Sequence, residues 1–200
     1  MKKLFIFYIF FKFLVLSTNP SYSLISLNCD DTISTAITIQ QTCQDEDTLI
    51  ITSAGSVILT GSNAIDADSH TGVTIDNKGT ISASVNQAID MQHAVNTTVT
   101  NSGTIEATLR NAILMDGVNA DNNTINNSGN LKAGKKQVIL ATNSENTTII
   151  NSGTIETTNS SNQNTGGINY YNTSGSAIDG ATITNSGTIF AYGTGIRFGT

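Results

Sequence analysis

Residues 98–107, Thr-Val-Thr-Asn-Ser-Gly-Thr-Ile-Glu-Ala, are the stretch of sequence that decides the fold, because versions of this stretch recur along the chain. Clear copies surround Gly79, Gly103, Gly129, Gly153 and Gly187, and a weaker copy, residues 50–59, surrounds Gly55. The steps between consecutive glycines are 24, 24, 26, 24 and 34 residues. Self-similarity at a nearly fixed period of this size indicates a solenoid, in which each unit covers the apolar face of the next.

Both flanks of each glycine have the alternating pattern of a β-strand. Four residues before the glycine, the side chain is a branched aliphatic, at Ile51, Ile75, Val99, Ile125, Ile149 and Ile183. Two residues after the glycine, it is again aliphatic, at Val57, Ile81, Ile105, Leu131, Ile155 and Ile189. The neighbouring positions are mostly Thr, Ser, Asn or Glu. This period-2 alternation predicts two strands, each with one buried face.

An Asn-x-Gly sequence lies between the two predicted strands of each clear copy. Its asparagines are Asn77, Asn101, Asn127, Asn151 and Asn185. Glycine adopts a positive φ without steric cost and asparagine tolerates the same region, so we expect the chain to turn a corner here. Asparagines at equivalent positions of stacked units can join their amides into a ladder, as they do in cross-β stacks.

A third strand is expected about ten residues after each glycine. Aliphatic residues recur there as two sets, Ile65, Ile89, Ile113 and Ile139, followed by Ala67, Met91, Met115 and Ala141. Three short strands and three turns in each repeat predict an all-β fold, a right-handed parallel β-helix of about six coils over residues 49–200. The longer last interval contains the Asn-, Ser- and Gly-rich stretch 159–173, which we expect to bulge from the coil as a loop.

The N-terminal segment has the pattern of an export signal. A basic start (Lys2, Lys3) precedes an apolar run over residues 4–16, and small residues before Leu24 predict cleavage between Ser23 and Leu24. The signal peptide would then span residues 1–23, and residues 24–48 would form an N-terminal cap on the solenoid. The alternative is a short anchor that stays attached.

Two cysteines, Cys29 and Cys43, are the only ones in the chain. In an exported protein, such a pair predicts a disulfide, and the alternative is two unpaired thiols. No predicted strand follows Phe198, so the β-edge there would be open, and we expect the 200 residues to be the front of a longer protein.

Composition favours a neutral or acidic outer surface. Without Lys2, Lys3 and Lys12, the chain has 15 acidic and 6 basic residues and a net charge of −9. No basic patch is visible, which argues against a nucleic-acid partner. Tyr, Phe and Thr faces of low charge suit contact with sugars or with other cell surfaces.

Acidic residues and histidines are the candidates for chemistry. Asp66 and Asp90 each follow an aliphatic residue of the third strand, and Asp179 follows Ile178 in a similar way. Stacked carboxylates can hold Ca²⁺ or act as an acid–base pair on sugars, although Leu114 and Leu140 interrupt this column. His70 and His93 lie in return loops of adjacent coils, where a metal site with Asp68 or Asp90 is an alternative to simple exposure. No catalytic residue and no cofactor is predicted, and a solvated acidic strip is the preferred interpretation.

The Asn-Ser-Gly-Thr-Ile copies at residues 101–105, 151–155 and 185–189, behind a signal peptide, resemble the passenger region of bacterial autotransporters. The resemblance covers residues 49–200. It implies export through the inner membrane and display at the outer membrane, or release outside the cell, by way of a translocator barrel that these 200 residues do not contain. We therefore expect a non-enzymatic adhesin or structural stalk that contacts cell surfaces or glycans through its stacked faces and loops. The alternative is a polysaccharide-acting lyase or glycoside hydrolase.

Overall fold

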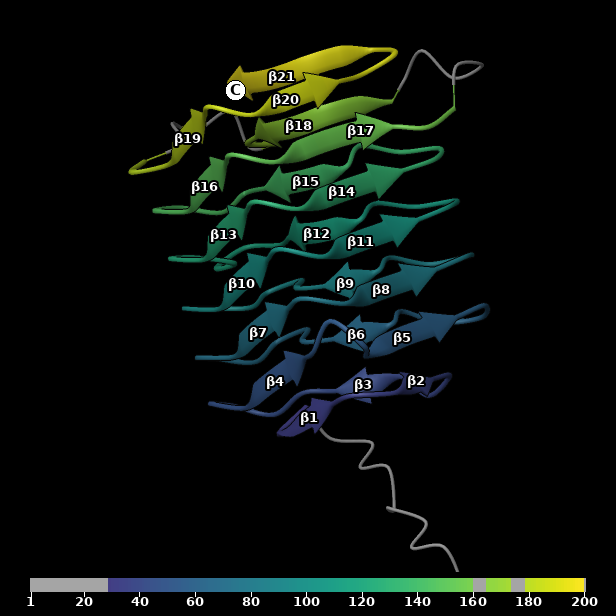
Figure 1. The fold of residues 1–200 in the computed structure, drawn as a ribbon. Coiled ribbons are helices and arrows are strands. Elements are labelled where there is room, and N and C mark those ends of the chain that lie inside the picture. Colours follow the sequence, from purple (N-terminus) through teal and green to yellow (C-terminus); the bar gives the residue numbers. More distant parts are fainter. Residues whose placement is uncertain (1–28, 160–164, 174–178, 200) are drawn as a thin grey trace, which may run out of the picture.

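The computed structural model describes residues 29–159, 165–173 and 179–199. The predicted signal peptide, with its cleavage point between Ser23 and Leu24, lies outside these ranges. Across them, every element of regular secondary structure is a β-strand, and the strands form three parallel sheets stacked as a solenoid (Figure 1). The prediction of an all-β, parallel solenoid is confirmed.

The chain visits the three sheets in turn, so every third strand belongs to the same sheet. The first sheet contains β1 (Asp31–Ile33), β4 (Thr48–Ile51), β7 (Thr74–Asn77), β10 (Thr98–Asn101), β13 (Thr124–Asn127), β16 (Thr148–Asn151) and β19 (Thr182–Asn185). The second sheet contains β2 (Ala36–Ile37), β5 (Ser56–Leu59), β8 (Thr80–Ala83), β11 (Thr104–Ala107), β14 (Asn130–Ala133), β17 (Thr154–Thr157) and β20 (Thr188–Phe190). The third sheet contains β3 (Gln41–Thr42), β6 (Ile65–Asp66), β9 (Ile89–Asp90), β12 (Ile113–Asp116), β15 (Ile139–Thr142), β18 (Gly166–Tyr171) and β21 (Thr194–Gly199).

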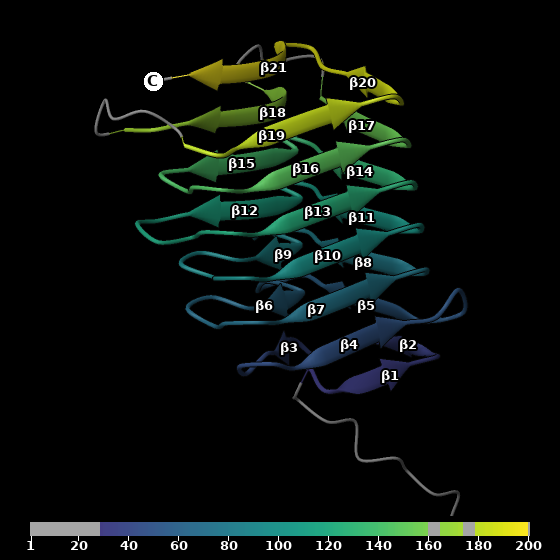
Figure 2. The same cartoon turned by 90° about the vertical axis from the view of Figure 1, so that its left-hand side faces the viewer.

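Each sheet has seven strands, so six turns separate the first coil from the last. Figures 1 and 2 show the coils as parallel layers along one axis. The register of each sheet places side by side residues about 24 positions apart, such as Ile81 with Ile105 and Ile105 with Leu131. The spacing of the glycines in the sequence is therefore the length of one turn.

The core is a set of aliphatic columns inside the three sheets. Ile75, Val99 and Ile125 stack in the first sheet, and Ile81, Ile105 and Leu131 in the second, all without solvent exposure. The third sheet adds the column Ile65, Ile89, Ile113, Ile139 and Ile168. Each fully buried aliphatic side chain contributes about 1.5–3 kcal/mol by leaving water.

Asparagines occupy the corner between the first and second sheets. In each of four consecutive pairs, one Nδ2 donates to the Oδ1 of the next coil's asparagine at 2.7 Å, along the series Asn77, Asn101, Asn127, Asn151 and Asn185. Each Nδ2 also lies 3.2–3.4 Å from the carbonyl oxygen of the corner glycine two residues later. We call this series the asparagine column. It satisfies amides that are otherwise enclosed by the core.

The corner glycines are needed for close packing, whereas we expected them to supply a positive φ. Gly103, Gly129 and Gly153 are not among the residues with positive φ. A Cβ built on Gly129 would instead lie 2.2 Å from the carbonyl oxygen of Gly103 in the coil before. Positive φ values recur at a different turn, between the third sheet and the first, at Glu46, Gly72, Asn96, Asn122, Asn146 and Gly180.

The register around the weaker copy differs from the sequence-based alignment. Leu49, and not Ile51, pairs with Ile75, while Ile51 pairs with Asn77 at the corner. The reason is that four residues separate Ile51 from Ser56, whereas two separate Asn77 from Thr80. Ile33 and Ile51 therefore continue the asparagine column downward as an apolar column.

The stretch 159–173 is in part a strand, which corrects the prediction of a bulging loop. Gly166–Tyr171 forms β18 and pairs with β15 on one side and β21 on the other. Ile168 and Tyr170 from this strand are fully buried, and the Tyr170 hydroxyl donates to the Ser144 carbonyl at 2.6 Å. The third strand of this coil begins later in the sequence because extra residues precede it, so Asp179 falls in the return turn.

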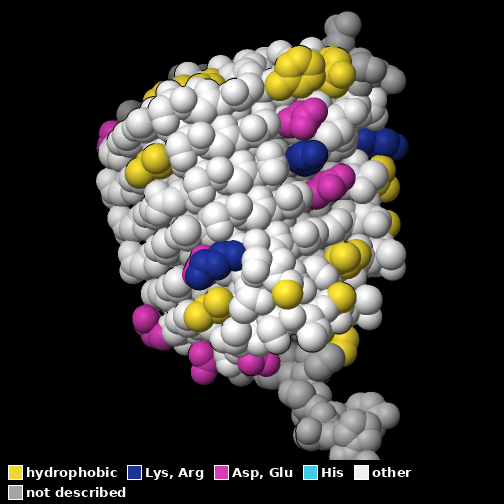
Figure 3. Space-filling model, in the orientation of Figure 1, with side chains coloured by type: hydrophobic (Ala, Val, Ile, Leu, Met, Phe, Trp, Pro, Cys, Tyr) yellow, Lys and Arg dark blue, Asp and Glu magenta, His cyan; other side chains and the backbone are white. Residues whose placement is uncertain are grey.

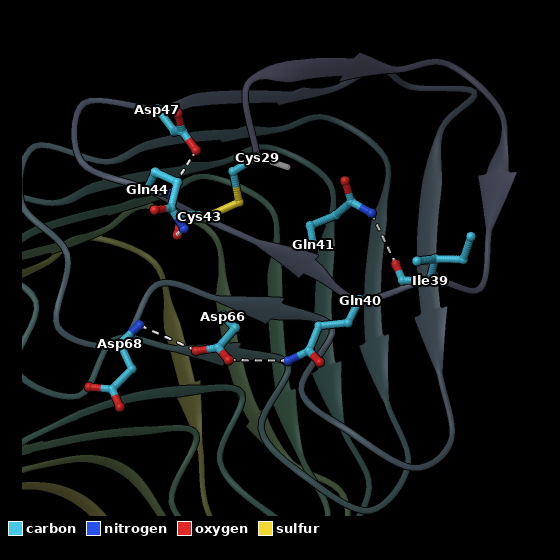
Figure 4. The surroundings of a disulfide bond; sticks show 9 residues. All are labelled: Cys29, Ile39, Gln40, Gln41, Cys43, Gln44, Asp47, Asp66 and Asp68. Carbon is cyan, nitrogen blue, oxygen red and sulfur yellow. Dashed lines mark hydrogen bonds between the residues drawn. A yellow bond between two sulfur atoms is a disulfide. The ribbon is translucent and has the colours of Figure 1, made fainter. Parts of the chain in front are cut away.

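Residues 29–47 form the first coil. The segment that we expected to be a cap contributes β1, β2 and β3, which pair with β4, β5 and β6. Cys29 and Cys43 are fully buried and joined by a disulfide, with their Cα atoms 4.6 Å apart, which confirms the predicted bond (Figure 4). The disulfide closes this coil at the point where the chain enters the stack.

Candidate functional site

Asp66 and Asp90 stack on neighbouring strands of the third sheet, as their spacing predicted. Both oxygens of Asp66 accept hydrogen bonds, from Gln40 Nε2 at 3.3 Å and from the Asp68 N–H at 3.3 Å (Figure 4). Asp90 repeats the pattern one coil later, with Asn63 Nδ2 at 2.9 Å and the Gln92 N–H at 3.3 Å. These contacts tie each carboxylate to its own turn and to the preceding loop.

Asp90 is the more enclosed of the two carboxylates, with 7 % of its surface exposed. Burial raises its pKa from 3.8 to about 6, against the opposing effect of the Gln92 N–H, and the charges of Asp66 and Asp68 add to the increase. Leu114, its neighbour on the next strand, is also buried. A carboxylate in such surroundings is protonated more readily than one in water, because burial penalises its charged form.

The two histidines pair with two different aspartates. His70 Nδ1 lies 3.2 Å from Asp45 Oδ1, and His93 Nδ1 lies 3.2 Å from Asp68 Oδ1. Each histidine therefore pairs with an aspartate of the coil before it. The pKa of Asp45 lies below its ordinary value, chiefly because the Thr71 N–H donates to it and secondly because of His70.

Within residues 29–159, 165–173 and 179–199, no three His, Cys, Asp or Glu side chains lie close enough together to hold a metal ion. Asp179 does not extend the Asp66–Asp90 column. Its carbonyl accepts from the Asn146 N–H in the return turn, and Asn169 and Arg197 take the later positions of that column.

An unbroken column of threonines lines the outer face of the first sheet. The members pair in register on six successive strands and are Thr48, Thr74, Thr98, Thr124, Thr148 and Thr182. We call them the threonine column. Across the part of the chain that the structure describes, none of their hydroxyls has a hydrogen-bond partner in the protein. In the sequence, five members of the column can be recognised as the threonine five residues before each clear corner glycine. Thr48 is recognised as a member only from its pairing with Thr74.

The outer face of the second sheet has a column of mixed charge. Ser82, Glu106, Lys132, Glu156 and Phe190 are in register, and Lys132 Nζ lies 3.8 Å from Glu156 Oε2. On the face shown in Figure 3, charged and hydrophobic side chains are accordingly scattered over a surface that consists mostly of backbone and other side chains. Half-exposed pairs of this kind contribute little to stability.

Aromatic side chains gather at the C-terminal end of the stack. Tyr170 and Phe198 stack with ring centroids 5.4 Å apart, and the Arg197 guanidinium lies 5.1 Å from the centre of the Tyr171 ring. A cavity of about 230 Å³ lies beside them, lined by Gln137, Thr165, Gly166, Ile168, Asn169, Thr194 and Arg197.

Comparisons with protein-family models, with curated proteins and with solved structures find no match to this chain. By its fold, the chain is a parallel β-solenoid of about six turns. In the described ranges, no helix has the length and apolar character needed to cross a membrane.

Proposed function

We propose that the chain is an exported β-solenoid of the autotransporter-passenger type, which acts outside the inner membrane as a rigid adhesive stalk. The observation that carries this proposal is the repetition of the outer surface. Side chains of one kind recur on successive strands and offer many equivalent weak contacts along one axis. Repeated contacts of low individual affinity add to strong attachment when the sites are held rigidly.

The disulfide supports export. Bonds between cysteines persist in oxidising compartments and are rare where thiols are kept reduced. Cys29 and Cys43 close the first coil, immediately after the predicted cleavage point. Expression of the full chain in a bacterium with an outer membrane tests this part of the proposal. The exported product should begin at Leu24, and a product that stays in the cytoplasm with Met1 intact would contradict export.

Adhesion is tested with beads coated with the purified chain and mixed with cells of different origins. Wild-type beads should bind at least one cell surface in numbers well above beads coated with the Ile105→Asp variant. This variant differs from the wild type by one side chain but should lose the stack, because it places a charge in the second-sheet core. Equal attachment of both kinds of bead would refute adhesion through the folded surface.

A polysaccharide-acting enzyme is the second candidate, and the observation that favours it is the pair Asp66 and Asp90. Glycoside chemistry uses two carboxylates, one with a raised pKa, and the pKa of Asp90 is raised to about 6. Release of reducing ends from a polysaccharide by the wild type, lost in Asp90→Asn, would establish this function. Loss of the release in Asp66→Asn as well would assign both carboxylates to the reaction.

A further inference from the structure

We propose that the threonine column is a binding surface for a linear, uncharged polysaccharide that lies along the axis of the stack. The inference rests on the proposed adhesive function, because it names the class of ligand for one of the repeated faces. The column runs along the face that is turned toward the viewer in Figure 2, over β4, β7, β10, β13, β16 and β19.

The hydroxyls of the column form a regular array. Strands in a sheet lie about 4.8 Å apart, so equivalent side chains repeat at this distance along the axis. Threonine is branched at Cβ and has few χ1 rotamers, which favours the same orientation at every step. Each hydroxyl can donate one hydrogen bond and accept others. Since none has a partner among the described residues, all are available to a ligand.

The face favours an uncharged ligand. Between β4 and β19 of the first sheet, Asp76 is the one charged residue within the strands. Its carboxylate lies 2.9 Å from Lys78 Nζ, so this charge is compensated locally. An ionic polymer would find no uncompensated opposite charge along the column. A neutral sugar chain, in contrast, offers hydroxyls to the threonine hydroxyls and C–H faces to the threonine methyl groups.

The ligand should repeat in one dimension. Two residues after each threonine, the next outward side chain differs from strand to strand, through Ile50, Asp76, Thr100, Asn126, Ile150 and Thr184. A two-dimensional lattice, such as an ice surface, requires a match at both columns, and only one is regular. The rings of an extended β-linked polysaccharide follow one another at a spacing close to that of neighbouring strands. A single polymer chain along the column therefore fits the pattern.

The experiment compares two triple variants of the full chain. Thr98→Val, Thr124→Val and Thr148→Val remove three central hydroxyls of the column while keeping a β-branched shape that suits a strand. The matched control removes Thr80, Thr104 and Thr154 in the same way, at the first positions of β8, β11 and β17 in the second sheet. Circular dichroism and thermal unfolding verify that both variants keep the fold.

The probes are three neutral polysaccharides (cellulose, xylan and mannan) and one acidic polysaccharide, polygalacturonate. Wild type should bind at least one neutral probe. The first variant should raise its Kd about tenfold or more, since three hydrogen bonds of about 0.5–1.5 kcal/mol each are lost, and the control should leave the Kd unchanged.

Four results would overturn the inference. They are unchanged binding by the first variant, an equal loss in the control, a preference for polygalacturonate that weakens with salt, and inhibition of ice recrystallisation that disappears in the first variant. If wild type binds no neutral probe but coated beads still adhere to cells, only this inference fails. If the beads also fail to adhere, the proposed function fails with it.

Discussion

The coil that contains β17 and β18 and the last described coil, which contains β20 and β21, carry apolar side chains at the same column positions but bury them to different extents. Ile168 in β18 and Tyr170 beside it are fully buried, whereas Ile196 and Phe198, their partners in β21, are 43 % and 50 % exposed. Ile155 is fully buried and its partner Ile189 is only half-buried. A coil therefore does not bury its own apolar side chains completely. Burial is supplied by the coil that follows.

The largest expected effect compares Ile105→Asp with Ile189→Asp. Both residues belong to the same column of the second sheet, but Ile105 has no exposed surface. An unpaired charge at Ile105 should abolish cooperative unfolding, because burying it without a partner exceeds the stability of a typical domain. Ile189→Asp should keep a cooperative transition at a lower Tm. Thermal unfolding measures both, and an unchanged transition in Ile105→Asp would contradict the inward assignment.

The asparagine column gives the second comparison, Asn127→Ala against Asn185→Ala. Asn127 is 3 % exposed and has a partner amide on each side at 2.7 Å, so its removal leaves two unpaired groups. The expected cost is about 2–6 kcal/mol, at about 1–3 kcal/mol for each group. Asn185 is exposed, and its loss should cost less. Denaturant unfolding measures the loss of unfolding free energy in both variants. An equal loss at both positions would mean that the amide-to-amide bonds contribute no stability beyond the local turn contacts.

Close approach of successive coils is tested by Gly129→Ala and Gly195→Ala. The new Cβ would meet the Gly103 carbonyl oxygen at the first position and nothing within 4 Å at the second. We expect a loss of about 1–3 kcal/mol at Gly129, as for other overpacked sites. Gly195→Ala should change the free energy of unfolding by no more than about 0.5 kcal/mol. An unchanged free energy of unfolding in Gly129→Ala would show that successive coils can move apart at this corner without cost.

The smallest expected effect is the change of stability with pH that is caused by the buried carboxylate of Asp90. The folded pKa of Asp90 is raised to about 6, so the folded state holds its proton more tightly than the unfolded chain does. The stabilisation is present below pH 3.8 and is lost as the pH rises through 6. Asp90→Asn should flatten this decline in urea unfolding curves recorded between pH 4 and pH 7, while Asp116→Asn, in β12 of the same sheet, serves as the control because Asp116 does not contribute to the shift at Asp90. If the urea midpoint of the wild type instead rises relative to that of Asp90→Asn over this pH range, the expected direction of the Asp90 effect on stability is wrong.

The aliphatic columns could be predicted from the sequence because each depends on a side chain that alternates in and out of a strand, and the period fixes which strands are neighbours. The register near Gly55 could not be predicted. Two additional residues lie at that corner, so Gly55 still aligns with the other glycines, but Leu49 and not Ile51 pairs with Ile75. The strand β18 was missed because a composition rich in Asn, Ser and Gly resembles a loop, while Tyr170 fills the core only in the presence of β15 and β21.

The loop side chains were also beyond prediction. His70 and His93 each lie beside an aspartate of the preceding coil, although Ser69, and not His70, is the equivalent of His93 in the turn, and both Ser69 and His93 have a positive φ that their residue type does not require. The role of the corner glycines illustrates the same limit. Glycine permits both a positive φ and a close approach, and only the position of the Gly103 carbonyl shows which of the two is used at Gly129.

The asparagine column makes the stack electrically directional. Its four amide-to-amide hydrogen bonds all run in one sense, with the amide nitrogen of each coil directed at the amide oxygen of the next. The amide dipoles therefore line up head to tail along the long axis, at right angles to the strands, and each polarises its neighbour. Loss of the hydrogen bond at any one step weakens the bonds above and below it, so the five asparagines act as one cooperative hydrogen-bond chain.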